Sequence, residues 1–203
     1  MRNCCIIGGA GIAEYFELPL DCFVIAADSG IRHLSGFGVL PDLIVGDFDS
    51  SSSDIDYDCE ILRYPPEKDD TDLMIAVKKA VSLGFERIFL VGVIGGRFDH
   101  TVASLQTLEY ISEHSAEGII LDKSCSAFIA NRGKHRYKAD KDCYFSVFSL
   151  TDESEVTLRG VKYELTRHKL SRSFPLGVSN EFISDYAEVE VLKGKLLIIY
   201  AKR

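Results

Sequence analysis

Five short apolar runs in the first 122 residues constrain the fold most, because none alternates with polar residues as a half-exposed strand does. Such runs predict strands that are buried on both faces, as in a parallel sheet covered by helices. They read CCIIGG (4–9), FVIAADSG (23–30), DLIVGDFD (42–49), RIFLVGVIGG (87–96) and GIILD (118–122). We therefore expect a mainly parallel, Rossmann-like sheet with flanking helices in this half of the chain.

Two segments between these runs have the length and periodicity of helices. Segment 70–84 stops at a glycine, which is typical of a helix end, and its apolar stripe holds Leu73, Val77, Ala80 and Val81. Segment 98–114 places Phe98, Val102 and Leu105 on one side, and the stripe continues less cleanly to Leu108. We expect these stripes to face the sheet.

The second half has a different texture, because its apolar residues alternate with polar ones. Segments 144–150, 154–160 and 187–201 predict strands with one solvated face, and no segment carries a convincing helical stripe. The Lys-Gly turn within LKGKL (192–196) predicts a hairpin. We expect an all-β sandwich or barrel, and domains at 1–123 and 124–203.

Charge divides along the same boundary. The net charge is −8, but residues up to Asp122 hold 8 Lys/Arg against 21 Asp/Glu, whereas the remainder hold 15 against 10. The acidic half would repel a phosphate backbone, so nucleic-acid binding is not expected.

Two observations bear on location. No run approaches the roughly 18 apolar residues of a membrane span. The six cysteines form no C-x-x-C pair and have no histidine at zinc spacing, so we interpret them as reduced, mostly buried side chains. Both features favour a cytoplasmic protein without a membrane partner.

Acidic residues follow the ends of the predicted strands in four motifs, AADSG, GDFDS, PPEKDDTD and GGRFDH. Ligands bind at the carboxyl edge of an open parallel sheet, so we expect these motifs to share one site. Capping of the next helix is an equally good interpretation of Asp28 alone, and it accounts for one of Asp69, Asp70 and Asp72.

Asp47 and Asp49 lie one residue apart, and no Lys or Arg occurs between Arg32 and Arg63. Two carboxylates without a local cation favour a hard divalent ion, and Mg²⁺ prefers a few carboxylates together with phosphate oxygens. Asp72, in the first turn of the helix expected at 70–84, is a further carboxylate on this edge. The sequence therefore predicts a magnesium site.

Positive groups near these motifs are candidates for binding phosphate. Arg97 follows two glycines and can clamp phosphate oxygens with two donors, whereas Lys68 offers a point charge; a surface ion pair is the alternative for each. GGAG at 8–11 admits a phosphate but is a weak signal alone, and no P-loop pattern occurs. For His100 we expect a core or supporting position rather than metal ligation.

Taken in order, DSG, GDFDS, KDDTD, GGRFDH and GVSNEF (177–182) resemble thiamine pyrophosphokinase of the bacterial type over nearly the whole chain. The resemblance implies transfer of pyrophosphate from ATP to the hydroxyl of thiamine, giving thiamine diphosphate and AMP. It also implies a requirement for Mg²⁺ and a homodimer whose active sites lie between subunits.

The resemblance also assigns roles to residues. It implies metal ligation by Asp47, Asp49 and Asp72, and catalytic roles for Asp72, Asp99 and Arg97. The ATP-binding positions are Asp28, Ser29, Gly30, Lys68, Arg97 and Asp99. Ser179 and Asn180 match the thiamine segment, where the amide suits the edge of an aminopyrimidine. Phe174 and Phe182 are alternative rings for stacking on thiamine, since the chain has no Trp.

Two other functions fit the motifs. A magnesium-dependent nucleotide phosphohydrolase would use the same clustered aspartates but would need no acceptor. A non-catalytic module that senses nucleotide or thiamine would bind ligand without turnover. Dependence of AMP formation on thiamine separates the three functions.

Overall fold

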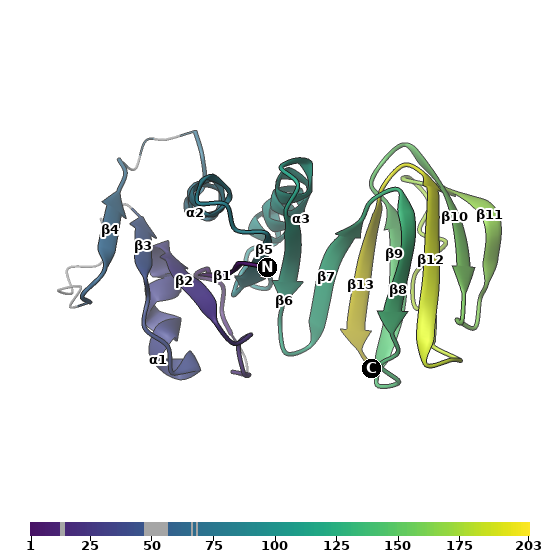
Figure 1. The fold of residues 1–203 in the computed structure, drawn as a ribbon, viewed down its shortest axis with the longest axis horizontal. Coiled ribbons are helices and arrows are strands. Elements are labelled where there is room, and N and C mark those ends of the chain that lie inside the picture. The colour runs from purple at the N-terminus through teal and green to yellow at the C-terminus, as the bar shows by residue number, and fades with distance from the viewer. Residues whose placement is uncertain (13–14, 47–56, 66, 68) are drawn as a thin grey trace. The chain divides into compact units, whose positions relative to one another are not determined.

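The computed structural model describes residues 1–12, 15–46, 57–65, 67 and 69–203. The chain forms two compact units, Met1–Lys123 and Ser124–Arg203, drawn in purple to teal and in green to yellow in Figure 1. Among the described residues, no helix has both the length and the hydrophobicity needed to span a membrane.

The described part of the first unit holds six strands in the order β4-β3-β2-β1-β5-β6, and every neighbouring pair is parallel. The strands are β1 (Asn3–Ile7), β2 (Cys22–Ala27), β3 (Leu43–Gly46), β4 (Glu60–Arg63), β5 (Arg87–Val91) and β6 (Glu117–Leu121). The predicted parallel sheet is confirmed. Strand β4 was not expected, because it is a short edge strand whose terminal residues are exposed.

The central strands are buried on both faces, as their continuous hydrophobicity predicts. Cys4 to Ile7 in β1 are completely buried. Burial also raises the pKa of the Cys4 and Cys5 thiols well above their usual value, so both remain protonated. All six cysteines are free thiols.

Helical segments connect the strands. They are a 3₁₀ helix η1 (Asp28–His33), α1 (Leu34–Phe37), α2 (Asp72–Ser82) and α3 (Phe98–Glu113). Helix α2 contacts β1, β2 and β3, and α3 contacts β6. The buried face of α2 includes Val77 and Ala80 from the predicted stripe, together with Ile75 and Ala76.

The stripe predicted for α3 is wrong except at Leu108, which is buried. The side chains of Phe98 and Val102 are 79% and 41% exposed, and the helix buries Ser104, Thr107, Leu108 and Ile111. These four residues have true helical spacing, but two of them are polar. Their hydroxyl groups bond to backbone carbonyls, which makes burial favourable and hides the inward face from a hydrophobicity pattern.

The order of the strands creates a topological switch beside β1. From β1 the chain adds β2, β3 and β4 on one side, then returns to place β5 and β6 on the other. In open parallel sheets, the turns at such a point diverge and leave a crevice at the carboxyl ends of the strands. The fold therefore places a crevice after β1 and β5.

The second unit is an antiparallel sandwich, as predicted. Its strands run in the orders β7-β13-β9 and β11-β10-β12-β8. They are β7 (Cys125–Ala130), β8 (Gly133–Lys138), β9 (Cys143–Ser149), β10 (Glu153–Arg159), β11 (Leu165–Ser171), β12 (Tyr186–Lys193) and β13 (Leu196–Lys202). Phe145 and Ile198 share one buried core with Leu158 and Val189 from the other set of strands.

The hairpin predicted at LKGKL is wrong. Strand β12 pairs with β10 and β8, whereas β13 pairs with β7 and β9. Gly194, with φ 82°, lies in the turn that carries the chain from one sheet to the other. A turn signal specifies the change of direction but not the partner of the strand that follows it.

Gly30 allows η1 to pack directly on β1, and its replacement tests this packing. An added Cβ would lie 2.0 Å from the Ile7 carbonyl oxygen, a backbone atom that cannot move aside. We expect Gly30→Ala to lower the free energy of unfolding by about 2 kcal/mol in denaturant titrations. Gly11→Ala is the matched control, because a Cβ there meets no atom within 4 Å. Equal stability of the two variants would contradict the packing argument.

Candidate active site

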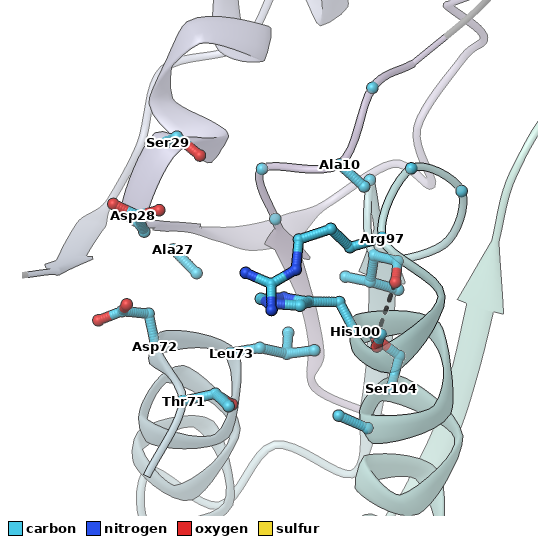
Figure 2. A pocket seen from close by; sticks show the side chains of 18 residues that line it. Ala10, Ala27, Asp28, Ser29, Thr71, Asp72, Leu73, Arg97, His100 and Ser104 are labelled. Atoms are coloured by element: carbon cyan, nitrogen blue, oxygen red, sulfur yellow. Dashed lines mark hydrogen bonds between the residues drawn. The ribbon is translucent and has the colours of Figure 1, made fainter. Parts of the chain in front are cut away.

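A pocket of about 430 Å³ lies at the switch point of the first unit (Figure 2). Its walls come from the turns after β1, β2 and β5 and from the first turns of α2 and α3. The order of the strands brings these five segments to one edge, although nearly 100 residues separate the first from the last.

One wall is main chain from two glycine turns. The Gly8 N–H donates to the Val91 carbonyl and the Ala10 N–H donates to the Gly92 carbonyl, each at 2.8 Å. A Cβ on Gly8 would lie 2.7 Å from the Gly92 oxygen, and a Cβ on Gly92 would lie 2.7 Å from the Gly8 oxygen. Only glycine at both positions allows the two turns to pack backbone against backbone.

Asp28 and Asp72 form the opposite, acidic wall (Figure 2). Asp28 adopts a left-handed backbone conformation with φ 50°, and η1 has no side-chain cap. No hydrogen bond joins the Asp28 carboxylate to another described residue. Capping therefore does not explain Asp28, and its carboxylate is available to a ligand.

The cap of α2 is Thr71, whose hydroxyl oxygen accepts a hydrogen bond from the Met74 N–H at 3.1 Å. Asp70 instead forms an ion pair of 2.7 Å with Lys78. The capping role that one of the aspartates was expected to fill belongs to the threonine between them. Asp72 lies in the first turn of α2, where the helix dipole stabilises negative charge.

Arg97 extends across the pocket toward the side that carries Asp28 and Asp72 (Figure 2). Its guanidinium group forms a two-point ion pair with Asp99, Nη2 to Oδ2 at 2.5 Å and Nε to Oδ1 at 3.2 Å. The hydrogen bond from Arg97 lowers the pKa of Asp99, so this pair persists above the usual pKa of an aspartate and is lost as pH falls through the lowered value. Both side chains are largely exposed, so the pair orients Arg97 more than it stabilises the fold.

The first turns of α3 are tied to the turn after β5. The buried Ser104 hydroxyl lies 2.8 Å from the carbonyl oxygens of both Val93 and His100. His100 lines the pocket beside Arg97 (Figure 2). It is exposed, so the core position that was one expectation for His100 is wrong, and the other expectation, a supporting position, stays a prediction.

The other predicted nucleotide residues have different positions. Ser29 lines the pocket, whereas Gly30 lies behind the wall and packs on β1. Asp47, Asp49 and Lys68 fall outside the described residues. Within the described ranges, no group of three or more His, Cys, Asp or Glu side chains could hold a metal ion.

In the second unit, the segment that contains Ser179 and Asn180 lies along β9. Main-chain hydrogen bonds join Asn180 and Phe145 in both directions, and the Val147 N–H donates to the Gly177 carbonyl. The Asn180 side chain is 5% exposed. Its Oδ1 accepts from the N–H groups of Tyr163 and Glu181, and its Nδ2 donates to the Tyr163 carbonyl. The amide therefore organises the main chain around it.

Ser179 and the two phenylalanines differ sharply in exposure. Ser179 is exposed, with φ 57°, and its N–H donates to the Ser146 hydroxyl. Phe182 is 9% exposed and packs between Phe145 and Tyr200 in the core, whereas Phe174 is 64% exposed. Of these two rings, that of Phe174 is the one available for stacking.

Three residues that shape the site, Thr71, Ser104 and Gly92, were not predicted from the sequence. A threonine immediately before a periodic apolar segment is a recognisable capping signal. Ser104 and Gly92 carry no comparable signal, because their roles depend on segments that are distant in the sequence.

Two family models match the chain in succession. The thiamin pyrophosphokinase catalytic domain matches residues 19–120, and the thiamin pyrophosphokinase vitamin B1 binding domain matches residues 134–196. Thiamine pyrophosphokinase of Bacillus subtilis (strain 168) is 29% identical over 182 residues, which cover 86% of this chain and 85% of the relative. Thiamin pyrophosphokinase 1 of Caenorhabditis elegans is 27% identical over 170 residues, covering 77% and 70%.

Solved structures have the same fold. The Bacillus subtilis thiamine pyrophosphokinase aligns with a TM-score of 0.91 and 23% identity over the full length of both chains. The thiamin pyrophosphokinase of Geobacillus thermodenitrificans aligns with a TM-score of 0.88 and 26% identity, covering 100% of this chain and 98% of the other.

The hydrogen bonds of Asn180 lead to a prediction about stability. In Asn180→Ala, two backbone N–H groups and one carbonyl lose their partner, so we expect the free energy of unfolding to fall by about 1–3 kcal/mol. Ser179→Ala removes an exposed hydroxyl at the neighbouring position and should change stability by less than about 0.5 kcal/mol. Thermal and denaturant unfolding measure both. An Asn180→Ala protein as stable as wild type would show that water replaces the amide without cost.

Proposed function

The chain belongs to the thiamin pyrophosphokinase family, and we propose that the pocket at the switch point of its first unit is where ATP reacts. The protein transfers pyrophosphate from ATP to thiamine, giving thiamine diphosphate and AMP. The succession of the catalytic and vitamin B1 binding matches carries this conclusion. Neither a phosphohydrolase nor a sensing module accounts for a thiamine domain that follows a catalytic one.

We assign the two substrates to the two units. Residues 1–123 form a Rossmann-like catalytic domain with flanking helices that binds ATP and magnesium, and residues 124–203 form the thiamine-binding domain. Support comes from the pocket, whose lining residues all belong to the first unit. The match of the vitamin B1 binding domain lies wholly within the second.

We propose Asp47, Asp49 and Asp72 as the magnesium ligands. The described part of the pocket fits a hard cation, because the Asp28 carboxylate has no hydrogen bond to another described residue and lies on the same wall as Asp72. Carboxylate oxygens are the donors that Mg²⁺ prefers. When bound, the ion neutralises charge on the phosphate oxygens of ATP.

The phosphate chain of ATP is bound by Arg97, with Asp99 holding the guanidinium group in orientation. The two-point ion pair between them supports this role, because it fixes the plane of the guanidinium fork. Asp28 and Ser29 contact the nucleotide from the turn after β2, and Lys68 adds a positive charge. Gly30 acts indirectly, through its packing on β1.

Thiamine is bound by the segment around Ser179 and Asn180. Asn180 acts by shaping this segment, since its amide already bonds to the main chain. Ser179 offers an exposed hydroxyl, and Phe174 offers an exposed ring for stacking. The acidic first unit also attracts the cationic thiazolium ring.

In the reaction, the thiamine hydroxyl oxygen attacks the β-phosphorus of ATP in line with the bond to the α-phosphate oxygen. The new O–P bond forms as that bond breaks, and AMP leaves with the bridging oxygen. The hydroxyl proton passes to a carboxylate, for which Asp72 and Asp99 are the candidates. Arg97 stabilises charge on the phosphate oxygens, so positioning and electrostatics supply most of the catalysis.

We further propose a cytoplasmic homodimer in which the second unit of one subunit completes the site of its partner. Segment 174–178 supports a partner on this surface, because it exposes three large apolar residues at alternate positions: Phe174 (64%), Leu176 (46%) and Val178 (51%). Exposed apolar residues that gather in one place are typical of interaction sites.

The reaction is tested by incubating the protein with ATP, Mg²⁺ and thiamine and separating the products. AMP and thiamine diphosphate should form together and only when thiamine is present. We expect Asp49→Asn to reduce turnover at least about 100-fold, equivalent to about 2.7 kcal/mol of transition-state stabilisation. Asp21→Asn is the control, because Asp21 precedes β2 at the opposite edge of the sheet. AMP released without thiamine would identify a hydrolase, and full activity of Asp49→Asn would remove that residue from the metal site.

Mixing two variants tests the shared site, once each variant alone is shown to have lost activity. Asp49→Asn damages the first unit and Phe174→Ala the second, so one of the two sites in a hybrid dimer would carry neither change. After subunit exchange about half of the dimers are hybrids, and we expect about a quarter of wild-type activity. Continued inactivity, with hybrids verified by mass, would place each site within one chain.

A further inference from the structure

The glycine turn Gly8–Gly11 has no role in the assignments above, yet it forms a wall of the pocket (Figure 2). We propose that the phosphate chain of ATP lies directly against this turn, and that Arg32 is a positioning residue that holds the turn in shape. This inference rests on the proposed function, because it names the part of the pocket that receives the phosphates.

The main-chain N–H groups of the glycine turn alternate in their hydrogen bonding. The N–H groups of Gly8 and Ala10 bond to the turn after β5. The N–H groups of Gly9 and Gly11 have no hydrogen-bond partner among the described residues. Main-chain N–H groups without such partners, at alternate positions of a turn whose largest side chain is the Ala10 methyl group, can donate to an anion.

Open volume borders the main chain of the glycine turn. A Cβ on Gly11 would meet no atom within 4 Å, and the same holds for Gly95 and Gly96 in the turn before α3. All three glycines line the pocket, so the main chain here borders open volume. Phosphate oxygens can approach the backbone at this wall as closely as a hydrogen bond requires.

Arg32 lies outside the pocket and links the turn after β1 to the turn after β2. Its Nη2 group donates to the Gly9 carbonyl at 2.6 Å and to the Ser29 hydroxyl at 3.3 Å. This contact places a positive charge on the Gly9 carbonyl oxygen. The arginine thereby fixes the peptide planes of the turn and reduces the repulsion of an anion by its carbonyl oxygens.

The charges around the pocket agree with this position. The acidic wall of Asp28 and Asp72 faces the glycine wall, and Arg97 reaches in from α3 (Figure 2). A phosphate chain on the glycine turn would present its outer oxygens to a cation on the acidic wall. The same chain would lie beneath the Arg97 guanidinium.

Gly11→Ala and Gly11→Val test the site, because a Cβ added at Gly11 meets no described atom within 4 Å and valine adds further volume from that position. ATP binding with Mg²⁺ is measured by calorimetry without thiamine, and adenosine is added as a competitor. We expect unchanged melting temperatures, ATP affinity at least about tenfold weaker in Gly11→Ala and weaker again in Gly11→Val, and unchanged affinity for adenosine.

The outcomes separate this inference from the proposed function. A wild-type protein that binds no ATP would contradict the proposed function itself. If the wild type binds ATP and Gly11→Val binds it equally well, the phosphate chain does not lie on this turn. Equal weakening of ATP and adenosine would place the nucleoside there instead and would also overturn the inference.

The role of Arg32 is tested with Arg32→Gln, and Arg87→Gln is the matched control because Arg87 pairs with Glu117 outside the pocket. We expect Arg32→Gln to raise the KM for ATP about fivefold while kcat and the KM for thiamine change less than twofold, and Arg87→Gln to change none of them. In Gly11→Ala with Arg32→Gln, the loss of ATP affinity should be smaller than the product of the single losses, because both act through one turn. Independent effects, or equal changes in the KM values of both substrates, would show that Arg32 does not act through the turn.

Discussion

The approach of main chain to main chain at the switch point is the constraint on which the pocket depends. Gly8 and Gly92 each occupy the space that a Cβ on the other would need, and Gly30 brings η1 against the Ile7 carbonyl in the same way. Side chains at these positions would separate the turns after β1, β2 and β5. The hydrophobic strands determine where the edge lies, but these glycines determine how closely its turns pack.

The distribution of charge follows from that geometry. The strand ends bring Asp28 and Asp72 to one wall, while Arg97 reaches in from α3 and pairs with Asp99 rather than with either of them. A direct ion pair across the pocket would close it and neutralise both walls. The acidic and basic groups instead lie on different walls of a pocket of about 430 Å³. This arrangement is complementary to a metal-bound anion, which presents both signs of charge.

The sequence was most informative where one local property decides the structure. Continuously apolar runs predicted the buried parallel strands, and alternation predicted the sandwich, because burial on one face or two leaves a periodic pattern. The inward face of α3 could not be predicted, since Ser104 and Thr107 are buried through hydrogen bonds to main-chain carbonyls. The turn at Gly194 could not reveal its sheet partners, because pairing depends on strands far away in the chain.

The candidate site shows the same division at the level of single residues. Asp28 was predicted from an acidic motif at the end of an apolar run and Asn180 from the family resemblance, and their surroundings differ completely. The Asp28 carboxylate faces the pocket without a hydrogen bond to a described residue, whereas every polar group of the Asn180 side chain bonds to main chain. A motif predicts that a residue type is required at a position. The hydrogen bonds around the residue determine whether a ligand or the fold requires it. The fold requires Asn180, because its amide is bonded to main chain before any ligand is bound.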